Sequence, residues 1–131
     1  MKTIKLLSIV LFIVTLITSL IHAADVTGKW QGEFDSMVGK QVYIYTISTV
    51  NDTLTGTAQA DIAGEKYESK LSNFKVTETE IRFTEHLDYQ GMPLVITYVG
   101  KINGDEIQFT RTVGDFEPEK FTAKRVQSKD K

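Results

Sequence analysis

Polar and apolar residues alternate strictly along Gly28–Phe34. Every second residue from Trp30 to Phe34 is aromatic or glycine, whereas Lys29, Gln31 and Glu33, which alternate with them, are polar. This period of two is typical of a β-strand with one face on a core and the other in solvent. A second segment of the same kind, Glu119–Val126, lies close to the end of the chain. Both segments are therefore predicted to be strands.

These first and last strands fit each other in one antiparallel register. The register places Trp30 opposite Arg125, Gly32 opposite Ala123 and Phe34 opposite Phe121. It predicts that the Arg125 guanidinium lies on the Trp30 indole, a contact that contributes about 0.5 to 2 kcal/mol. Pairing the two strands would also close the sheet and remove both of its edges.

Six further β-rich stretches lie between these two strands, and no segment of the mature chain has a helical period. The expected turns are 36–39, 51–52, 63–65, 77–80, 88–93, 103–104 and 114–118. Eight strands joined by short turns predict an all-β protein, an eight-stranded antiparallel up-and-down β-barrel. At eight strands the interior is just wide enough for its own side chains or for one small ligand.

The hairpin around Asn51-Asp52 settles which face of its first strand points inward. Its pairing sets large residues against small ones, as the inside of a narrow barrel requires. The pairs are Tyr43 with Ala60, Tyr45 with Ala58 and Ile47 with Gly56. Val42 and Ile44 are then left on the outside.

Three further expectations concern the second half of the barrel. The inward set changes parity near Ser72-Asn73, which predicts a β-bulge. Residues 88–93 are expected to form a longer loop, a candidate lid. Asn103-Gly104 predicts a tight hairpin turn that would pair Tyr98 with Phe109 and Ile96 with Arg111.

The Gly-x-Trp at Gly28-Lys29-Trp30, together with Arg125 on the last strand, resembles the lipocalin-like (calycin) superfamily. The whole mature chain is similar to a family of small secreted bacterial lipocalin-like domains, mostly of unknown function. The resemblance implies a closed barrel and, by analogy with ligand-carrying lipocalins, a lumen that holds a small molecule. The chain lacks the extra helices of larger relatives, so any such cup would be shallow.

The N-terminus reads as a secretory signal peptide over residues 1–23. Two lysines precede an almost wholly apolar run from Leu6 to Ile21, and cleavage is expected after Ala23. An uncleaved membrane anchor is the alternative, although the run is a little short of the ~20 residues of a spanning helix. The barrel domain is assigned to 24–126 and a charged tail to 127–131. The protein is therefore expected to be exported, to the periplasm or outside the cell, with no stable membrane span after cleavage.

Composition excludes several classes of function. Without residues 1–23, which hold two of the 15 lysines and arginines, the chain has 13 bases against 17 acids, a net charge of −4. A mildly acidic surface argues against nucleic acids as partners. The chain has no cysteine, and His86 is the only histidine after the signal segment, so no metal site or cofactor is expected. No catalytic motif is present, and the protein is predicted not to be an enzyme.

The most informative residues are two charges that face inward, Glu85 and Arg111. An unpaired charge inside a barrel costs several kcal/mol, so they should meet each other or a ligand. As a binding site for a small amphipathic or anionic molecule, Arg111 would hold its head group. The candidate lumen residues are Tyr43, Tyr45, Phe83, Glu85, Tyr98 and Arg111. As a structural ion pair, the same residues would fix the register, and the protein would act through a protein partner instead.

Overall fold

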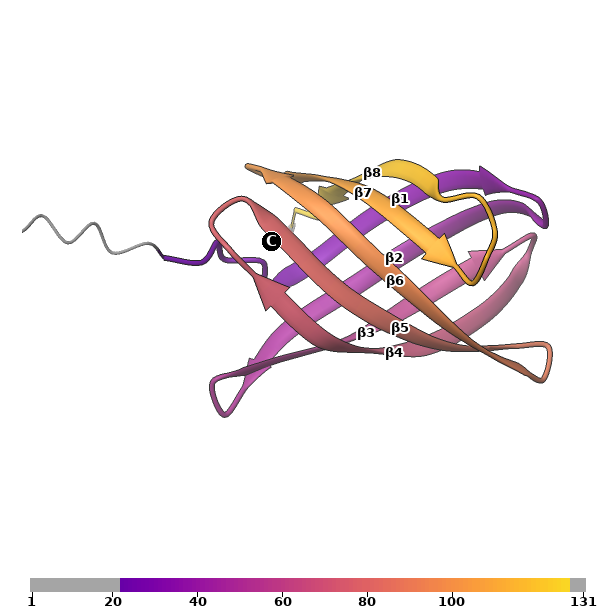
Figure 1. Cartoon of the computed structure of the whole chain (residues 1–131), viewed down its shortest axis with the longest axis horizontal. Helices are drawn as coiled ribbons and strands as arrows, with labels where there is room; N and C mark the ends of the chain where they lie inside the picture. Colours follow the sequence, from indigo (N-terminus) through magenta and orange to yellow (C-terminus); the bar gives the residue numbers. More distant parts are fainter. Residues whose placement is uncertain (1–21, 128–131) are drawn as a thin grey trace, which may run out of the picture.

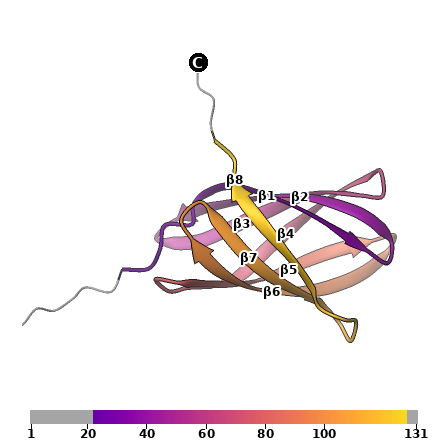
Figure 2. The same ribbon diagram turned by 90° about the horizontal axis from the view of Figure 1, so that it is seen from above.

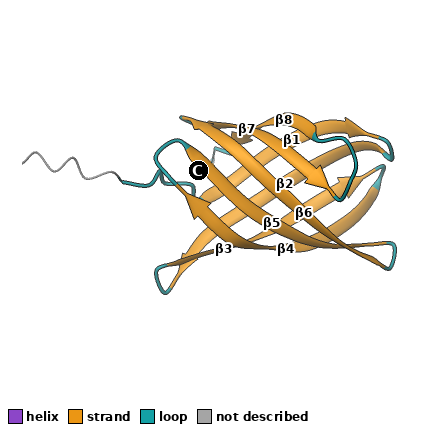
Figure 3. Ribbon diagram, in the orientation of Figure 1, coloured by secondary structure: helices purple, strands orange, loops and turns teal. Residues whose placement is uncertain are grey.

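Eight strands follow one another in the computed structural model, which describes residues 22–127. The strands are β1 (Gly28–Ser36), β2 (Gly39–Val50), β3 (Thr53–Ile62), β4 (Glu65–Val76), β5 (Glu80–Tyr89), β6 (Met92–Asn103), β7 (Glu106–Val113) and β8 (Glu119–Arg125). Each pairs antiparallel with the next, and β8 pairs with β1, so the sheet closes (Figures 1 and 3). The predicted up-and-down barrel is confirmed. The predicted signal segment and tail lie outside the described residues, except for His22, Ala23 and Gln127.

The closing register is the predicted one. Trp30 pairs with Arg125 and Gly32 with Ala123, and Figure 2 shows β1 and β8 side by side from above. The strand pairing does not extend to Phe34, but its ring stacks on that of Phe121 with 4.5 Å between centroids. A Cβ at Gly32 would lie 2.6 Å from the Phe121 ring, so only glycine leaves room for this ring at the seam.

The β2–β3 hairpin also has the predicted register. Tyr43 pairs with Ala60 and Tyr45 with Ala58, and all four side chains are buried. Asn51 and Asp52 form the turn with φ of 52° and 62°, the left-handed values that a tight hairpin turn requires. Small residues on β3 therefore make space inside the barrel for the large rings of β2.

The β6–β7 hairpin differs from prediction by two residues. Asn103 pairs with Glu106, so the turn is Gly104-Asp105 rather than Asn103-Gly104. The shift places Phe109 opposite Gly100, where a Cβ would lie 2.8 Å from the Phe109 ring. The predicted register would instead have set two large rings against each other. A shift of two preserves parity, so every inward residue stays inward.

The predicted loop at 88–93 does not form. Strand β5 continues to Tyr89 and β6 begins at Met92, leaving a turn of only Gln90 and Gly91. Their φ values of 55° and 83° close a tight turn of the same left-handed type, so the flanking residues pair. The prediction of a long loop at 88–93, and with it the candidate lid, was therefore wrong.

The predicted bulge is confirmed in β4. The pairing of β4 with β5 is interrupted between Ser72 and Lys75, and Asn73 has a φ of 56°. Leu71 is buried on one side of this point, and Phe74 packs against the core on the other. The bulge thus adds one residue to β4, so that Leu71 before it and Phe74 after it both face the core.

The two ends of the barrel differ. One end, called the floor here, carries the connections β2–β3, β4–β5 and β6–β7 and both ends of the described part of the chain (Figure 1). The opposite end, called the rim, is formed by residues 35–40, 61–66, 88–93 and 113–119, which include the other four connections. No helix within residues 22–127 is long and apolar enough to span a membrane.

Candidate functional site

A hydrogen-bonded polar network lies inside the barrel around the carboxylate of Glu85, whose side chain is 0% exposed. Tyr98 Oη donates to Glu85 Oε1 at 2.6 Å. Ser69 Oγ and Tyr43 Oη donate to Glu85 Oε2 at 2.7 and 3.0 Å. Three donors from β4, β2 and β6 thus converge on one acid from β5, which satisfies most of its lone pairs.

Arg111 of β7 reaches the same network from the rim side. Its Nε donates to Tyr98 Oη at 2.9 Å and its Nη2 to Tyr43 Oη at 3.0 Å. Its Nη1 donates to Glu119, while the distance from Nη2 to Glu85 Oε1 is 4.0 Å. The guanidinium therefore contacts Glu85 chiefly through two tyrosine hydroxyls and pairs directly with Glu119.

Aromatic rings fill the space around these charges. Tyr45 Oη donates to Tyr98 Oη at 3.1 Å, and its ring meets that of Tyr98 edge on. Phe83 stacks on Tyr98 with centroids 4.6 Å apart. The guanidinium carbon of Arg111 lies 5.1 Å from the Phe34 centroid and 5.2 Å from that of Tyr43, within cation–π range. All six predicted lumen residues thus meet in one cluster.

The corrected β6–β7 register explains how the cluster forms. Tyr98 lies opposite Phe83 on one side and Arg111 on the other, while Glu85 lies opposite Ile96. Tyr98 rather than Ile96 is therefore the cross-strand neighbour of Arg111, and its hydroxyl bridges the two charges. The expected pairing of Arg111 with Ile96 was wrong.

Two members of the network were not among the predicted site residues. Ser69 follows the inward parity of β4, and only the long-range contact with Glu85 gives it a role. Glu119 directly follows the expected turn at 114–118. It begins β8 directly opposite Arg111, with 22% of its side chain exposed. The β7–β8 register is the signal that identifies it.

The hydroxyl protons of the network are held firmly. Burial, reinforced by the nearby charge of Glu85, raises the pKa of Tyr43 and Tyr45 well above the usual value. Burial and the neighbouring Tyr45 and Glu85 likewise raise the pKa of Tyr98. The three hydroxyls therefore remain neutral donors at physiological pH. Within residues 22–127, the only buried side-chain polar atom without a partner is Oε1 of Gln41, near the rim.

Trp30 and Arg125 form a second cluster at the floor. The Arg125 guanidinium carbon lies 4.3 Å from the Trp30 ring centroid, as predicted. Arg125 donates to Thr27 O at 2.7 Å, Asp25 O at 3.0 Å and Asp105 Oδ1 at 3.0 Å. The Trp30 indole N–H donates to the carbonyl of Val26 at 3.0 Å, and Val26 is buried. The pair therefore fastens residues 25–27 across the floor.

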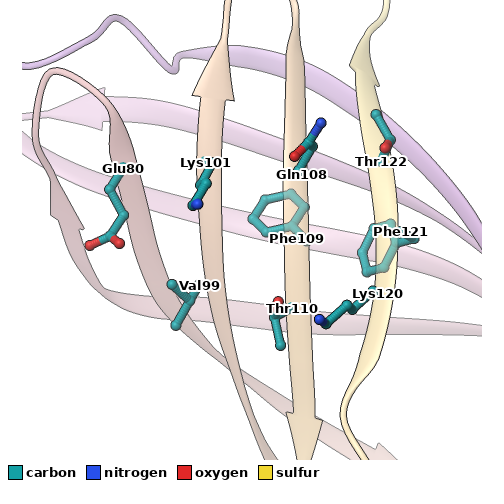
Figure 4. A pocket seen from close by; sticks show the side chains of 9 residues that line it. All are labelled: Glu80, Val99, Lys101, Gln108, Phe109, Thr110, Lys120, Phe121 and Thr122. Atoms are coloured by element: carbon teal, nitrogen blue, oxygen red, sulfur yellow. The ribbon is translucent and has the colours of Figure 1, made fainter.

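The outer wall carries two shallow hollows. One, of about 420 Å³, lies over β6, β7 and β8 and is bordered by Lys101, Lys120 and Thr122 (Figure 4). The other, of about 500 Å³, lies over β2, β3 and β4 and includes Val42 and Ile44. These two residues face outward, as predicted, and each is half-buried.

Comparison with protein-family models, curated proteins and solved structures finds no match to this chain. The fold itself is consistent with a lipocalin-like barrel. No group of three potential metal-ligating side chains occurs in residues 22–127. His86 points outward, and its Nε2 lies 3.0 Å from Ser72 Oγ. The function must therefore be argued from the barrel itself.

Proposed function

We propose that the protein is an exported binding protein that recognises another protein through its outer surface, with the barrel interior acting as a rigid scaffold. The observation that carries this proposal is the state of the lumen. Glu85 and Arg111 are 0% and 3% exposed, and their polar atoms are bound by neighbouring side chains. Groups that are already dry and hydrogen-bonded gain little from a ligand.

The outer surface supplies what the lumen lacks. Half-buried Val42 and Ile44 form an apolar strip on the wall, and exposed Met37 and Phe116 stand at the rim. Exposed apolar groups within a polar surface are typical of protein interaction sites. A filled barrel holds such groups in fixed positions, which lowers the entropic cost of binding.

A small ligand in a shallow lumen is the second candidate function. Two observations favour it: Arg111 lies beneath the rim, covered by the partly exposed Glu119, and Oε1 of Gln41 lacks a partner nearby. An anionic head group that displaced Glu119 could accept the hydrogen bond that Arg111 now donates to Glu119. The resemblance to lipocalin-like (calycin) proteins supports the same proposal by analogy of fold.

Native mass spectrometry separates the two candidates. The exported protein would be purified from its own cells and incubated with an extract of those cells. Its native mass would then be compared with the masses of two variants treated in the same way, Arg111→Met and the floor variant Arg125→Lys. The scaffold proposal predicts a mass equal to the polypeptide alone in all three. A bound small molecule that is lost in Arg111→Met and kept in Arg125→Lys would establish the lumen as a ligand site and overturn the scaffold proposal.

Chemical cross-linking in the producing cells tests the protein partner directly. The proposal predicts a second polypeptide cross-linked to outward-facing lysines such as Lys40, Lys66 or Lys101. Cross-links confined to the protein itself at physiological concentration would contradict it.

Export rests on the signal segment and has its own measurement. Intact-mass analysis of the exported material should give a chain that begins at Ala24. A chain that retained residues 1–23 in a membrane fraction would show the segment to be an anchor instead.

A further inference from the structure

We propose that the rim is the docking surface, and that its partner is a protein segment that carries both positive charges and apolar anchors. This inference rests on the proposed function and names the site and the chemistry of the partner. Two features of the rim carry it: its exposed apolar side chains, and a negative charge that its own bases do not neutralise.

Exposed apolar side chains gather at the rim. Of the seven large apolar residues that are exposed within residues 22–127, four belong to it, with exposed fractions between 47% and 83%. They are Met37, Val38, Met92 and Phe116. They lie in or directly beside the β1–β2, β5–β6 and β7–β8 connections, which follow one another around the closed barrel because β8 lies beside β1. The apolar residues therefore occupy one continuous arc of the rim.

The backbone gives no reason for apolar residues in the β1–β2 turn, Met37-Val38. The other two-residue turns contain Asn, Asp, Gly, Ala or Gln, and most of their residues have positive φ. Met37 and Val38 have no such φ, and Met37 exposes 83% of its surface. Phe116 is held outward in an ordered loop, since its N–H donates to the carbonyl of Val113 at 3.0 Å. Exposing large apolar side chains to water is unfavourable. Their presence on the surface therefore favours a role in binding a partner that covers them.

The rim also holds the whole excess of negative charge. Residues 22–127 contain 16 of the 17 acids and 11 of the 15 lysines and arginines, because Asp130, Lys2, Lys5, Lys129 and Lys131 lie outside. Seven of these acids and two of these bases belong to the rim, a net charge of −5. The remaining nine acids and nine bases balance. The negative field of the described barrel is therefore concentrated where its apolar side chains are exposed.

The two bases of the rim do not neutralise this charge. Lys40 pairs with Glu33, which lies just below the rim, and Lys66 pairs with Asp61. Asp35, Asp88, Asp115 and Glu117 make no ion pair within the described part of the chain. A partner with lysine or arginine beside apolar anchors complements both features, whereas an anionic lipid surface or an acidic segment would be repelled. Because these charges are exposed, binding that depends on them should weaken as the salt concentration rises.

A synthetic amphipathic peptide of lysine and leucine is the probe, and a glutamate and leucine peptide of the same pattern is its control. Binding would be measured by titration calorimetry at about 50 mM and about 300 mM salt. We expect the basic peptide to bind, with at least about tenfold lower affinity at the higher salt. Equal binding of the acidic peptide, or no binding of the basic one, would overturn the inference.

Two rim variants and two floor variants locate the site. At the rim, apolar anchors are removed in Met37→Ser/Phe116→Ser, and negative charge is removed in Asp115→Asn/Glu117→Gln. At the floor, the matching changes are Val50→Ser/Val126→Ser and Asp52→Asn/Glu78→Gln. Each rim variant should weaken binding about tenfold, and each floor variant less than about twofold. Equal losses at both ends would show that the attraction is unspecific. Thermal melting checks that each variant folds.

The cross-linking experiment keeps this inference distinct from the proposed function. A partner cross-linked only to outer-wall lysines such as Lys101 would leave the proposed function intact and refute the rim as its site. Sedimentation of the wild type tests a second copy as the occupant. A wild-type dimer that dissociates in Met37→Ser/Phe116→Ser would show that the rim binds a second copy of the protein rather than a basic segment, and would overturn the inference.

Discussion

At the scale of single residues, Tyr98 organises the interior. Its hydroxyl donates to Glu85 and accepts from both Arg111 and Tyr45, so one oxygen serves three neighbours. The sequence predicted that these charges face inward and that they meet each other or a ligand. It could not predict that Glu119 completes the network, because a glutamate at a loop end looks the same whether or not an arginine lies opposite.

Replacing Tyr98 with phenylalanine should destabilise the protein by about 1 to 3 kcal/mol. The substitution keeps the ring but leaves Glu85 Oε1 and Arg111 Nε without their hydrogen-bond partner in a dry interior. Urea unfolding measures the loss. Tyr67→Phe is the matched control, since its hydroxyl bonds to exposed Glu65 at the rim. If both variants lose equally little stability, water must reach the network and replace the missing hydrogen bonds.

Replacing Arg125 with alanine should cost about 2 kcal/mol. The variant loses the stacking on Trp30 and three hydrogen bonds that hold residues 25–27 and Asp105. The unfolding midpoint in urea measures the loss. Lys124→Ala on the same strand, which faces solvent, should be almost neutral. An Arg125→Ala variant as stable as the wild type would mean that the seam does not depend on this residue.

At the scale of elements, the period of two determined most of what could be predicted. It assigned inward and outward faces correctly, and the match of large to small residues gave the β1–β8 and β2–β3 registers. A slip of two residues preserves every face, so parity alone could not distinguish the two β6–β7 registers. The fit of Phe109 over Gly100 decides between them.

The β5–β6 turn gives a prediction at this scale. Gln90 has a φ of 55°, so Gln90→Gly should relieve backbone strain and stabilise the protein by about 0.5 to 1 kcal/mol. Gln59→Gly is the matched control: Gln59 is an exposed residue inside β3, where glycine should cost a similar amount. Thermal melting compares the two. A loss of stability in Gln90→Gly equal to that in Gln59→Gly would argue against the tight turn.

At the scale of the whole molecule, the filled interior makes the barrel sensitive to alkali. The pKa of three buried tyrosines is raised in the folded state. Below the unfolded tyrosine pKa of about 10 these hydroxyls are neutral in both states, so they contribute no pH dependence to stability there. Above it only the unfolded chain releases their protons, and stability falls as pH rises.

Each buried tyrosine should therefore lower the free energy of unfolding by up to about 1.4 kcal/mol per pH unit above pH 10. Tyrosinate absorbance from these residues should appear together with the loss of β-sheet circular dichroism. Tyr43→Phe removes one of the three protons and should make the decline less steep. Full tyrosinate absorbance in a protein that still has native circular dichroism would show that the hydroxyls are not sealed inside.

The closure of β8 on β1 also concerns the order in which contacts form. In the natural chain, the Trp30–Arg125 pair joins residues 95 positions apart, whereas every other strand pairing is a local hairpin. Ala24 and Val126 both lie at the floor, so a short linker could join them, and new ends could be opened at Gln90-Gly91. In that circular permutant, β8 and β1 would become a local hairpin, and β5 with β6 the distant pair. Which seam closes last is thus a matter of chain connectivity rather than of the barrel's geometry.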